Sequence, residues 1–180
     1  MTFESDGILT SGRRIILEPI TIEHYEFLYD LFIDEDINFH WRLAGLVPPK
    51  RTFQRTLWDA VLCQFVVLNR NDMKPAGLVQ SYKADLHLGH AYVGGAFIRA
   101  AQRTGIPIEG FRVFIDYLLS TWSLRKLYFE YPGYNEPQFA SLSRLPIVKE
   151  ASLVDYGYFN GRYWDWTIFT LDVKHIQERE

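Results

Sequence analysis

The residues best placed to do chemistry stand between a β-rich run and an amphipathic segment. Residues 100–105, Ala-Ala-Gln-Arg-Thr-Gly, form a polar connection at this point of the chain. A helix start leaves backbone N–H groups unpaired and carries the positive end of the helix dipole, so this position favours an anion such as phosphate or pyrophosphate. An ordinary strand-to-helix connection is the alternative. The spacing matches neither a P-loop nor a dinucleotide fingerprint.

The elements on either side of this connection are the ones that must position it. Downstream, six apolar residues recur at helical spacing, which predicts a long amphipathic helix with Pro107 at its start; they are Phe111, Phe114, Ile115, Leu118, Leu119 and Trp122. Upstream, 76–83 and 90–99 are expected to be antiparallel strands joined by a turn at 85–89. Gly94-Gly95 in the second strand indicates a bulge or a close approach of another backbone or a ligand.

The remaining elements alternate between strands and helices. We expect strands at 13–20, 65–68, 126–131, 148–159 and 162–171, helices from Ile22, over 52–61 and over 135–142, a loop at 36–50 and a turn at 69–72. Asn160-Gly161 favours a type I′ turn, so the last two strands are expected to form a hairpin. The order predicts one mixed α/β (α+β) domain over 1–180, with frayed ends at 1–12 and 172–180.

Composition narrows the classes of protein. The chain has 180 residues, 48% of them hydrophobic and 23% charged, and a net charge of −3, which is typical of a globular domain and argues against nucleic-acid binding. The single cysteine, Cys63, excludes an internal disulfide, and its apolar neighbours indicate an inert core thiol. We find neither a secretory signal nor an apolar run long enough for a membrane helix, and we therefore expect a cytoplasmic protein with no membrane partner.

The connection and its flanks resemble a known family. The run Phe97-Ile98-Arg99, the segment 102–107 (Gln-Arg-Thr-Gly-Ile-Pro) and the order of elements resemble the GCN5-related N-acetyltransferase (GNAT) superfamily. The ending 151–166 is similar to the branch that contains the ribosomal-protein N-terminal alanine acetyltransferases. The resemblance runs from Arg13 to Leu171. It implies a mixed, mostly antiparallel sheet of about seven strands with helices on both faces.

The resemblance also implies a cofactor and the residues that bind it. Acetyl-CoA or another acyl-CoA would be the co-substrate, no metal would be needed, and an amine of a small molecule or peptide would attack the thioester directly. The strand with Gly94-Gly95 would diverge from its neighbour to make the pantetheine slot. The residues implied to bind CoA are Phe97, Ile98 and Arg99 on the pantetheine arm, Gln102, Arg103, Thr104, Gly105, Ile106 and Pro107 around the pyrophosphate, and Asn135 on the pantetheine side.

Two positions depart from the family pattern. Pro107 replaces a Gly or Ala and removes one amide that the family offers to phosphate. Leu142 occupies the position at which many members carry a tyrosine that protonates the leaving thiolate. Ser141 and Ser143 flank Leu142 and could reach a sulfur atom, although ordinary helix-end serines would look the same. We take Ser141 as the candidate acid.

The candidates for the general base are His90 and Glu130. His90 follows a turn that also contains Asp85 and His87, and histidine as a residue type suits proton transfer near neutral pH. Glu130 lies on the strand that would face the slot. A surface histidine and a solvent-facing glutamate are the plain alternatives. The spacing of these residues supports no metal site.

Aromatic residues make up 16% of the chain and gather in its last third. Half of them are expected in the core, and the rest predict an apolar pocket or a subunit contact, with a homodimer as one outcome. We expect an acyl-CoA-dependent N-acyltransferase. The alternatives are a non-catalytic acyl-CoA-binding or regulatory module of the same fold, and an unrelated α/β domain.

Overall fold

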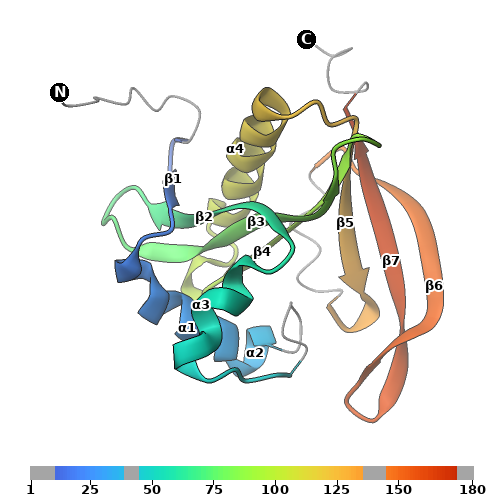
Figure 1. The fold of residues 1–180 in the computed structure, drawn as a ribbon, viewed down its shortest axis with the longest axis horizontal. Coiled ribbons are helices and arrows are strands. Elements are labelled where there is room, and N and C mark those ends of the chain that lie inside the picture. Colours follow the sequence, from blue (N-terminus) through green and yellow to red (C-terminus); the bar gives the residue numbers. More distant parts are fainter. Residues whose placement is uncertain (1–10, 39–44, 136–144, 174–180) are drawn as a thin grey trace.

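The computed structural model describes residues 11–38, 45–135 and 145–173. Seven strands form one sheet in the order β1-β2-β3-β4-β5-β7-β6 (Figure 1). The strands are β1 Ile15–Pro19, β2 Val61–Asn69, β3 Pro75–Asp85, β4 His90–Phe97, β5 Lys126–Pro132, β6 Val148–Phe159 and β7 Arg162–Asp172. The helices are α1 Tyr25–Ile33, α2 Glu35–Asn38, α3 Lys50–Trp58 and α4 Ile106–Thr121, with 3₁₀ turns at Ile22–His24 (η2), Arg99–Ala101 (η3) and Gly133–Asn135 (η4). The expected mixed sheet of seven strands is confirmed.

All neighbouring strands of this sheet run antiparallel except β4 and β5, which are parallel. The β6–β7 hairpin turns at Asn160 and Gly161, whose φ values of 50° and 81° fit the expected type I′ turn. The sheet therefore consists of a meander, β1 to β4, and a second group, β5 to β7, that meet along one parallel pair.

The two faces of the sheet are covered by different helices. On one face α4 packs with Phe114 and Leu118 fully buried, in a cluster that also includes Phe129 of β5. On the other face α1 and α3 cover the meander around Leu28 and Phe53. Each fully buried side chain of this size contributes roughly 1.5–3 kcal/mol of hydrophobic stabilisation. Helices on both faces are as the resemblance implied.

The first half of the chain corrects three sequence-based boundaries. The expected loop at 36–50 begins with the short helix α2, and α3 begins at Lys50 and ends at Trp58, earlier than the expected 52–61. The strand expected at 65–68 begins already at Val61. Gln64 interrupts the apolar pattern there, but it is buried in β2 because its Nε2 donates to Leu57 O at 3.1 Å.

Residues near both ends of the described chain are hydrogen-bonded to the rest of the fold, where the sequence predicted frayed ends. Ser11 forms a β-bridge with Ile16, and Gly12 O accepts a hydrogen bond from Arg70 Nη1 at 2.7 Å. At the other end Val173 is 8% exposed and its N–H donates to Arg125 O at 3.1 Å. The prediction of frayed ends is therefore wrong for 11–12 and 172–173, because these hydrogen bonds tie the backbone to the body.

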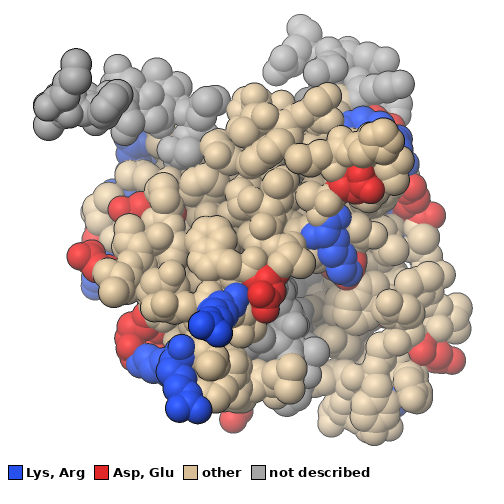
Figure 2. Space-filling model, viewed as in Figure 1, with Lys and Arg blue, Asp and Glu red and all other residues tan. Residues whose placement is uncertain are grey.

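On the face shown in Figure 2, acidic and basic side chains are scattered and do not gather in one patch of a single sign. Among the helices of the described ranges, none is long and apolar enough to cross a bilayer. Within 11–38, 45–135 and 145–173, no three His, Cys, Asp or Glu side chains gather in a way that could hold a metal ion.

Candidate active site

A slot opens where β4 and β5 separate. The two strands pair over three residues, from His90 opposite Lys126 to Tyr92 opposite Tyr128. β4 continues to Phe97 and β5 to Pro132, but no residue pair joins the two strands beyond Tyr92 and Tyr128. The backbone of each strand that faces the other is thereby left for a ligand, as the resemblance implied.

Gly95 lies on the β4 side of this slot. Its register with β3 is continuous, Val79 opposite Gly95 and Gln80 opposite Gly94, so the first of the two expectations for this glycine pair, a bulge, is wrong. The second expectation, a close approach, holds: a Cβ on Gly95 would lie 2.9 Å from both Leu78 O and Phe111 Cζ. The glycine lets the ring of Phe111, from α4, press on the strand.

Backbone hydrogen bonds show which amides of β4 face the slot. The N–H of Ile98 donates to Ala76 O at 3.0 Å and therefore points toward β3. Because successive amides in a strand point to opposite sides, the N–H groups of Gly95 and Phe97 point toward β5. The Phe97 side chain itself is buried against Phe111, with ring centroids 5.9 Å apart. Of the three residues expected on the pantetheine arm, Phe97 offers an amide to the slot and Arg99 is exposed just beyond it.

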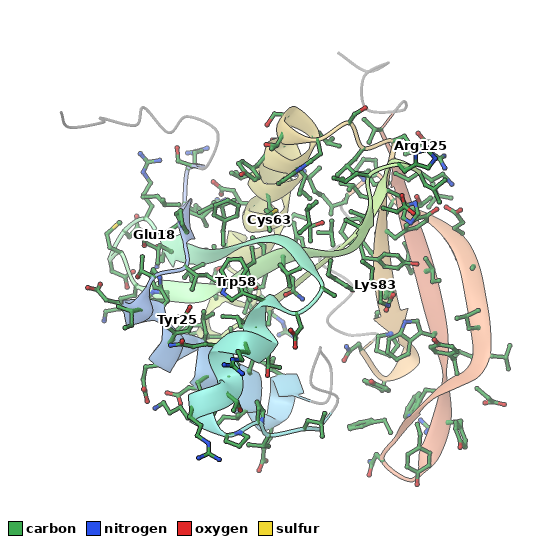
Figure 3. All side chains as sticks on the ribbon, viewed as in Figure 1. Glu18, Tyr25, Trp58, Cys63, Lys83 and Arg125 are labelled. Atoms are coloured by element: carbon green, nitrogen blue, oxygen red, sulfur yellow. The ribbon has the colours of Figure 1, made fainter. Side chains whose placement is uncertain are left out.

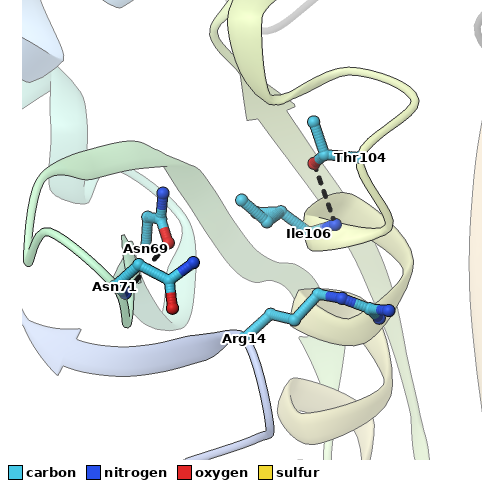
Figure 4. Close-up of a pocket in the computed structure, with 5 residues that line it drawn as sticks. All are labelled: Arg14, Asn69, Asn71, Thr104 and Ile106. Atoms are coloured by element: carbon cyan, nitrogen blue, oxygen red, sulfur yellow. Dashed lines mark hydrogen bonds between the residues drawn. The ribbon is translucent and has the colours of Figure 1, made fainter.

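The connection to α4 has the form of an anion-binding loop. Arg103 and Gly105 adopt left-handed conformations, with φ values of 63° and 87°, on either side of Thr104. Such alternation turns neighbouring N–H groups toward one concave side. The Thr104 hydroxyl accepts the N–H of Ile106 at 3.2 Å and donates to Ala101 O at 2.6 Å (Figure 4), while Pro107 has no N–H.

Some amides of this loop already have acceptors. Gln102 N donates to Arg99 O at 3.2 Å, and Thr104 N to Ala101 O at 3.4 Å. For the amides of Arg103, Gly105 and Ile108, the part of the chain that the structure describes offers no acceptor within hydrogen-bond distance. These three amides, at the positive end of α4, are the ones that could meet a phosphate.

Arg14 is a candidate site residue that sequence reasoning missed. It stands just before β1, and a Cβ on Gly105 would lie 3.3 Å from its Nη1. A surface cavity of about 320 Å³ lies here, lined by Arg14, Asn69, Asn71, Thr104 and Ile106 (Figure 4). The carboxylate of Glu109, in α4, accepts the backbone N–H of Arg14 at 2.9 Å and lies 3.5 Å from Nη1 of the Arg14 guanidinium. The Arg13-Arg14 pair was the one signal in the sequence, and it is a weak one.

Beside the slot, the sheet face opposite α4 carries a polar and aromatic cluster. Phe129 and Leu127 point into the core under α4, so Tyr128 and Glu130 point to the opposite face. Tyr92 lies against Tyr128, with ring centroids 5.2 Å apart. Burial, followed by the charge of Glu130, raises the pKa of Tyr92, so its hydroxyl stays protonated at neutral pH. In the described part of the chain, α1 and α3 cover the β2–β4 part of this face.

Glu130 forms an ion pair on this face. Its Oε1 lies 2.7 Å from Lys83 Nζ, and the side chain of Glu130 is 18% exposed against 57% for Lys83 (Figure 3). Lys83 comes from β3, so its side chain passes over the Tyr92 ring of β4, 5.0 Å from the centroid, to reach β5. Glu130 lies two positions after Tyr128, the last residue of β5 that pairs with β4, and therefore stands beside the slot.

The other candidate acid and base residues stand elsewhere. His90 begins β4 in the paired part of the strands, with its ring 5.6 Å from Tyr128, so it lies at the closed end of the slot. The Asp85 carboxylate accepts the N–H of Leu88 at 2.8 Å and stabilises the turn. Asn135 ends η4 directly after β5. Ser141, and most of the helix expected over 135–142, lie outside the described residues.

Aromatic residues of the last third partly pack on one another. Tyr134 lies 4.5 Å from Phe159 and 5.8 Å from Trp164 between ring centroids, and Trp164 Nε1 donates to Phe159 O at 3.0 Å. This cluster anchors the hairpin to η4. Tyr156 and Tyr163 remain more than 60% exposed. The aromatic-lined acceptor pocket therefore stays a prediction.

Comparisons with solved structures identify the fold. No family model matches the chain, and no curated protein matches its sequence. The structure is similar to that of a spermidine N-acetyltransferase from Vibrio cholerae in complex with CoA and spermine, with a TM-score of 0.76, 18% identity, and 91% of this chain and 98% of that chain covered. It is also similar to RimL, a ribosomal L7/L12 α-N-protein acetyltransferase in complex with CoA, with a TM-score of 0.80, 14% identity, and coverage of 92% and 97%.

At this level of identity the comparisons show the fold. The chain has the GNAT fold over nearly its whole length, as the resemblance implied.

Proposed function

We propose that the protein is an acyl-CoA-dependent N-acyltransferase. It would move an acyl group, in the simplest case acetyl, from CoA to the amine of a small molecule or of a peptide N-terminus. One observation carries the proposal: on a GNAT fold, β4 and β5 separate beside the loop before α4, in which left-handed Arg103 and Gly105 flank Thr104. A thioester in the slot and a pyrophosphate on the loop account for both features together.

The residues at the slot support direct attack by the amine. The outward N–H groups of Gly95 and Phe97 would hold the pantetheine arm. An outward N–H of β4 nearer the closed end of the slot would polarise the thioester carbonyl, which stabilises the charge that develops on its oxygen. Glu130 is the better-placed base, because it stands beyond the paired part of the strands, where His90 does not. Arg14, together with the amides of Arg103 and Gly105, would meet the pyrophosphate.

Location and partners form a second part of the proposal. The mildly acidic net charge of −3 supports a cytoplasmic enzyme that acts without a nucleic-acid or membrane partner. The edge strand β6 exposes Val154, Tyr156 and Tyr158, which supports a homodimer through the C-terminal strands. Gel filtration with light scattering distinguishes the dimer from a monomer.

Two measurements test the activity. Acetyl-CoA at 100 times its dissociation constant should stabilise the folded protein by about 2.7 kcal/mol in thermal unfolding, and dephospho-CoA and acetate serve as comparison ligands. Release of free CoA thiol is then followed with a panel of amines. Stabilisation without turnover of any amine would favour the non-catalytic acyl-CoA-binding module. No stabilisation would overturn both functions.

A further inference from the structure

An unusual backbone conformation places the side-chain amine of Lys83 beside the slot. Its φ of 46° is left-handed, and the pairing of β3 with β4 shifts register between Tyr82 and Asp85. In a regular strand, neighbours point to opposite faces. The irregularity instead brings the Lys83 ammonium over the rings of both Tyr82 and Tyr92, at 5.8 and 5.0 Å from their centroids.

The amine of Lys83 meets the requirements for an acceptor. It is a primary amine, its side chain is 57% exposed, and it lies 2.7 Å from the carboxylate of Glu130, the better-placed base. It crosses β4 at Tyr92, the last residue of β4 that pairs with β5. A thioester carbonyl at the closed end of the slot would therefore lie beside this nitrogen, on the face of the sheet opposite α4.

We propose that Lys83 is a self-acylation site: with acyl-CoA bound, the protein transfers the acyl group to Lys83 Nζ. This inference rests on the proposed function. Glu130 accepts one proton from the ammonium and passes it to solvent. The neutral nitrogen attacks the thioester carbon, the N–C bond forms and the C–S bond breaks. CoA leaves as the thiolate and takes up the second proton that the nitrogen loses, so the products are an amide, CoA thiol and one proton.

The chain contains a matched comparison for ordinary chemical acylation. Lys50 also pairs with a carboxylate, that of Glu26, and also lies over a tyrosine ring, 5.5 Å from the centroid of Tyr29. Its side chain is 55% exposed, nearly the same as Lys83. Lys50 begins α3, however, away from the β4–β5 slot. A reaction that needs only an exposed, ion-paired lysine should modify both, with Lys50 the slower because its hydrogen bond to Glu26 raises the pKa of its amine.

The experiment measures acetylation of individual lysines in the full-length protein. After incubation with acetyl-CoA the protein is denatured, the remaining amines are labelled with isotopically heavy acetic anhydride, and the heavy-to-light ratio at each lysine is read by mass spectrometry. We expect Lys83 to be acetylated at least tenfold faster than Lys50. Excess CoA, which fills the slot without an acyl group, should slow Lys83 and leave Lys50 unchanged.

Two variants test the assigned roles. Glu130→Gln keeps the shape of the side chain but removes the proton acceptor, so acetylation of Lys83 should slow at least tenfold while that of Lys50 is unchanged. Lys83→Arg should abolish the CoA-sensitive gain of mass in the intact protein. Circular dichroism and thermal unfolding establish that each variant is folded.

Several results would overturn the inference. One is acetylation of Lys83 at the rate of Lys50; another is a Lys83 rate that excess CoA does not change. A rate constant that rises with protein concentration would place the transfer between molecules instead of within one. If amines are turned over while Lys83 stays unmodified, the self-acylation fails and the proposed function stands. If acetyl-CoA neither stabilises the protein nor yields thiol, both fail.

Discussion

Two glycines with left-handed backbones allow the role of the loop in binding to be tested separately from the strain of the backbone. Gly105 of the loop and Gly161 of the hairpin have φ values of 87° and 81°, so alanine at either position should destabilise the fold by about 1 kcal/mol. The substitutions differ in their surroundings: a Cβ at Gly105 faces Arg14 Nη1 at 3.3 Å, and one at Gly161 meets nothing within 4 Å. We expect Gly105→Ala to weaken acetyl-CoA binding at least tenfold and Gly161→Ala to leave it unchanged.

Denaturant unfolding and calorimetric titration with acetyl-CoA measure the two effects. Gly161→Ala is the matched control, because it carries the same backbone strain away from the loop. Equal losses of affinity in both variants would show that the loop conformation is not what binds the cofactor.

Cys63 illustrates how burial controls the chemistry of one residue. Desolvation raises the pKa of its thiol to about 12, so hardly any thiolate is present at pH 8 (Figure 3). A thiol-specific disulfide reagent should react with the native protein at least about a hundredfold more slowly than with the unfolded chain. Since the folded pKa is raised, this group favours folding below the unfolded value near 9, and the contribution is lost as the pH rises toward 12. Rapid native labelling at pH 8 would contradict the expectation.

At the scale of elements, the sequence predicted what local chemistry determines. The β6–β7 hairpin follows from Asn160-Gly161 and α4 from six apolar residues at helical spacing, and both were found within a few residues of their expected bounds. The start of β2 was missed because a polar residue, Gln64, stands in a buried position where its Nε2 donates to Leu57 O. Pattern reasoning assigns a polar residue to the surface and cannot anticipate such a partner.

The site was less predictable because its contacts join distant elements. The loop 102–106 could be proposed from its place between a strand and a helix. Arg14 could not, since it reaches Gly105 only after β1 has joined the edge of the sheet. The Lys83–Glu130 pair depends on the register of β3, β4 and β5 together and on an irregularity in β3. Residue type and spacing along the chain contain none of this.

The whole molecule consists of two groups of strands with one short junction. In the described part of the chain, the three residue pairs between β4 and β5 are the only strand pairing between β1–β4 and β5–β7. The meander β2-β3-β4 and the hairpin β6-β7 connect strands that are neighbours in sequence, whereas β4 and β5 are separated by the whole of α4. Pairings between distant residues form late in folding, because closing the intervening chain costs entropy.

The separation of β4 from β5 thus has a consequence for dynamics. A junction of three residue pairs should open at lower free energy than the meander, as a cooperative unit within the native state. In hydrogen exchange at increasing denaturant, the amides of Ala91 and Tyr128, which face each other's strand across the junction, should lose protection before those of Val66 and Leu78. Bound acetyl-CoA, touching both strands, should delay the loss at the junction alone. Simultaneous loss at all four amides would mean that the two groups of strands unfold as one body.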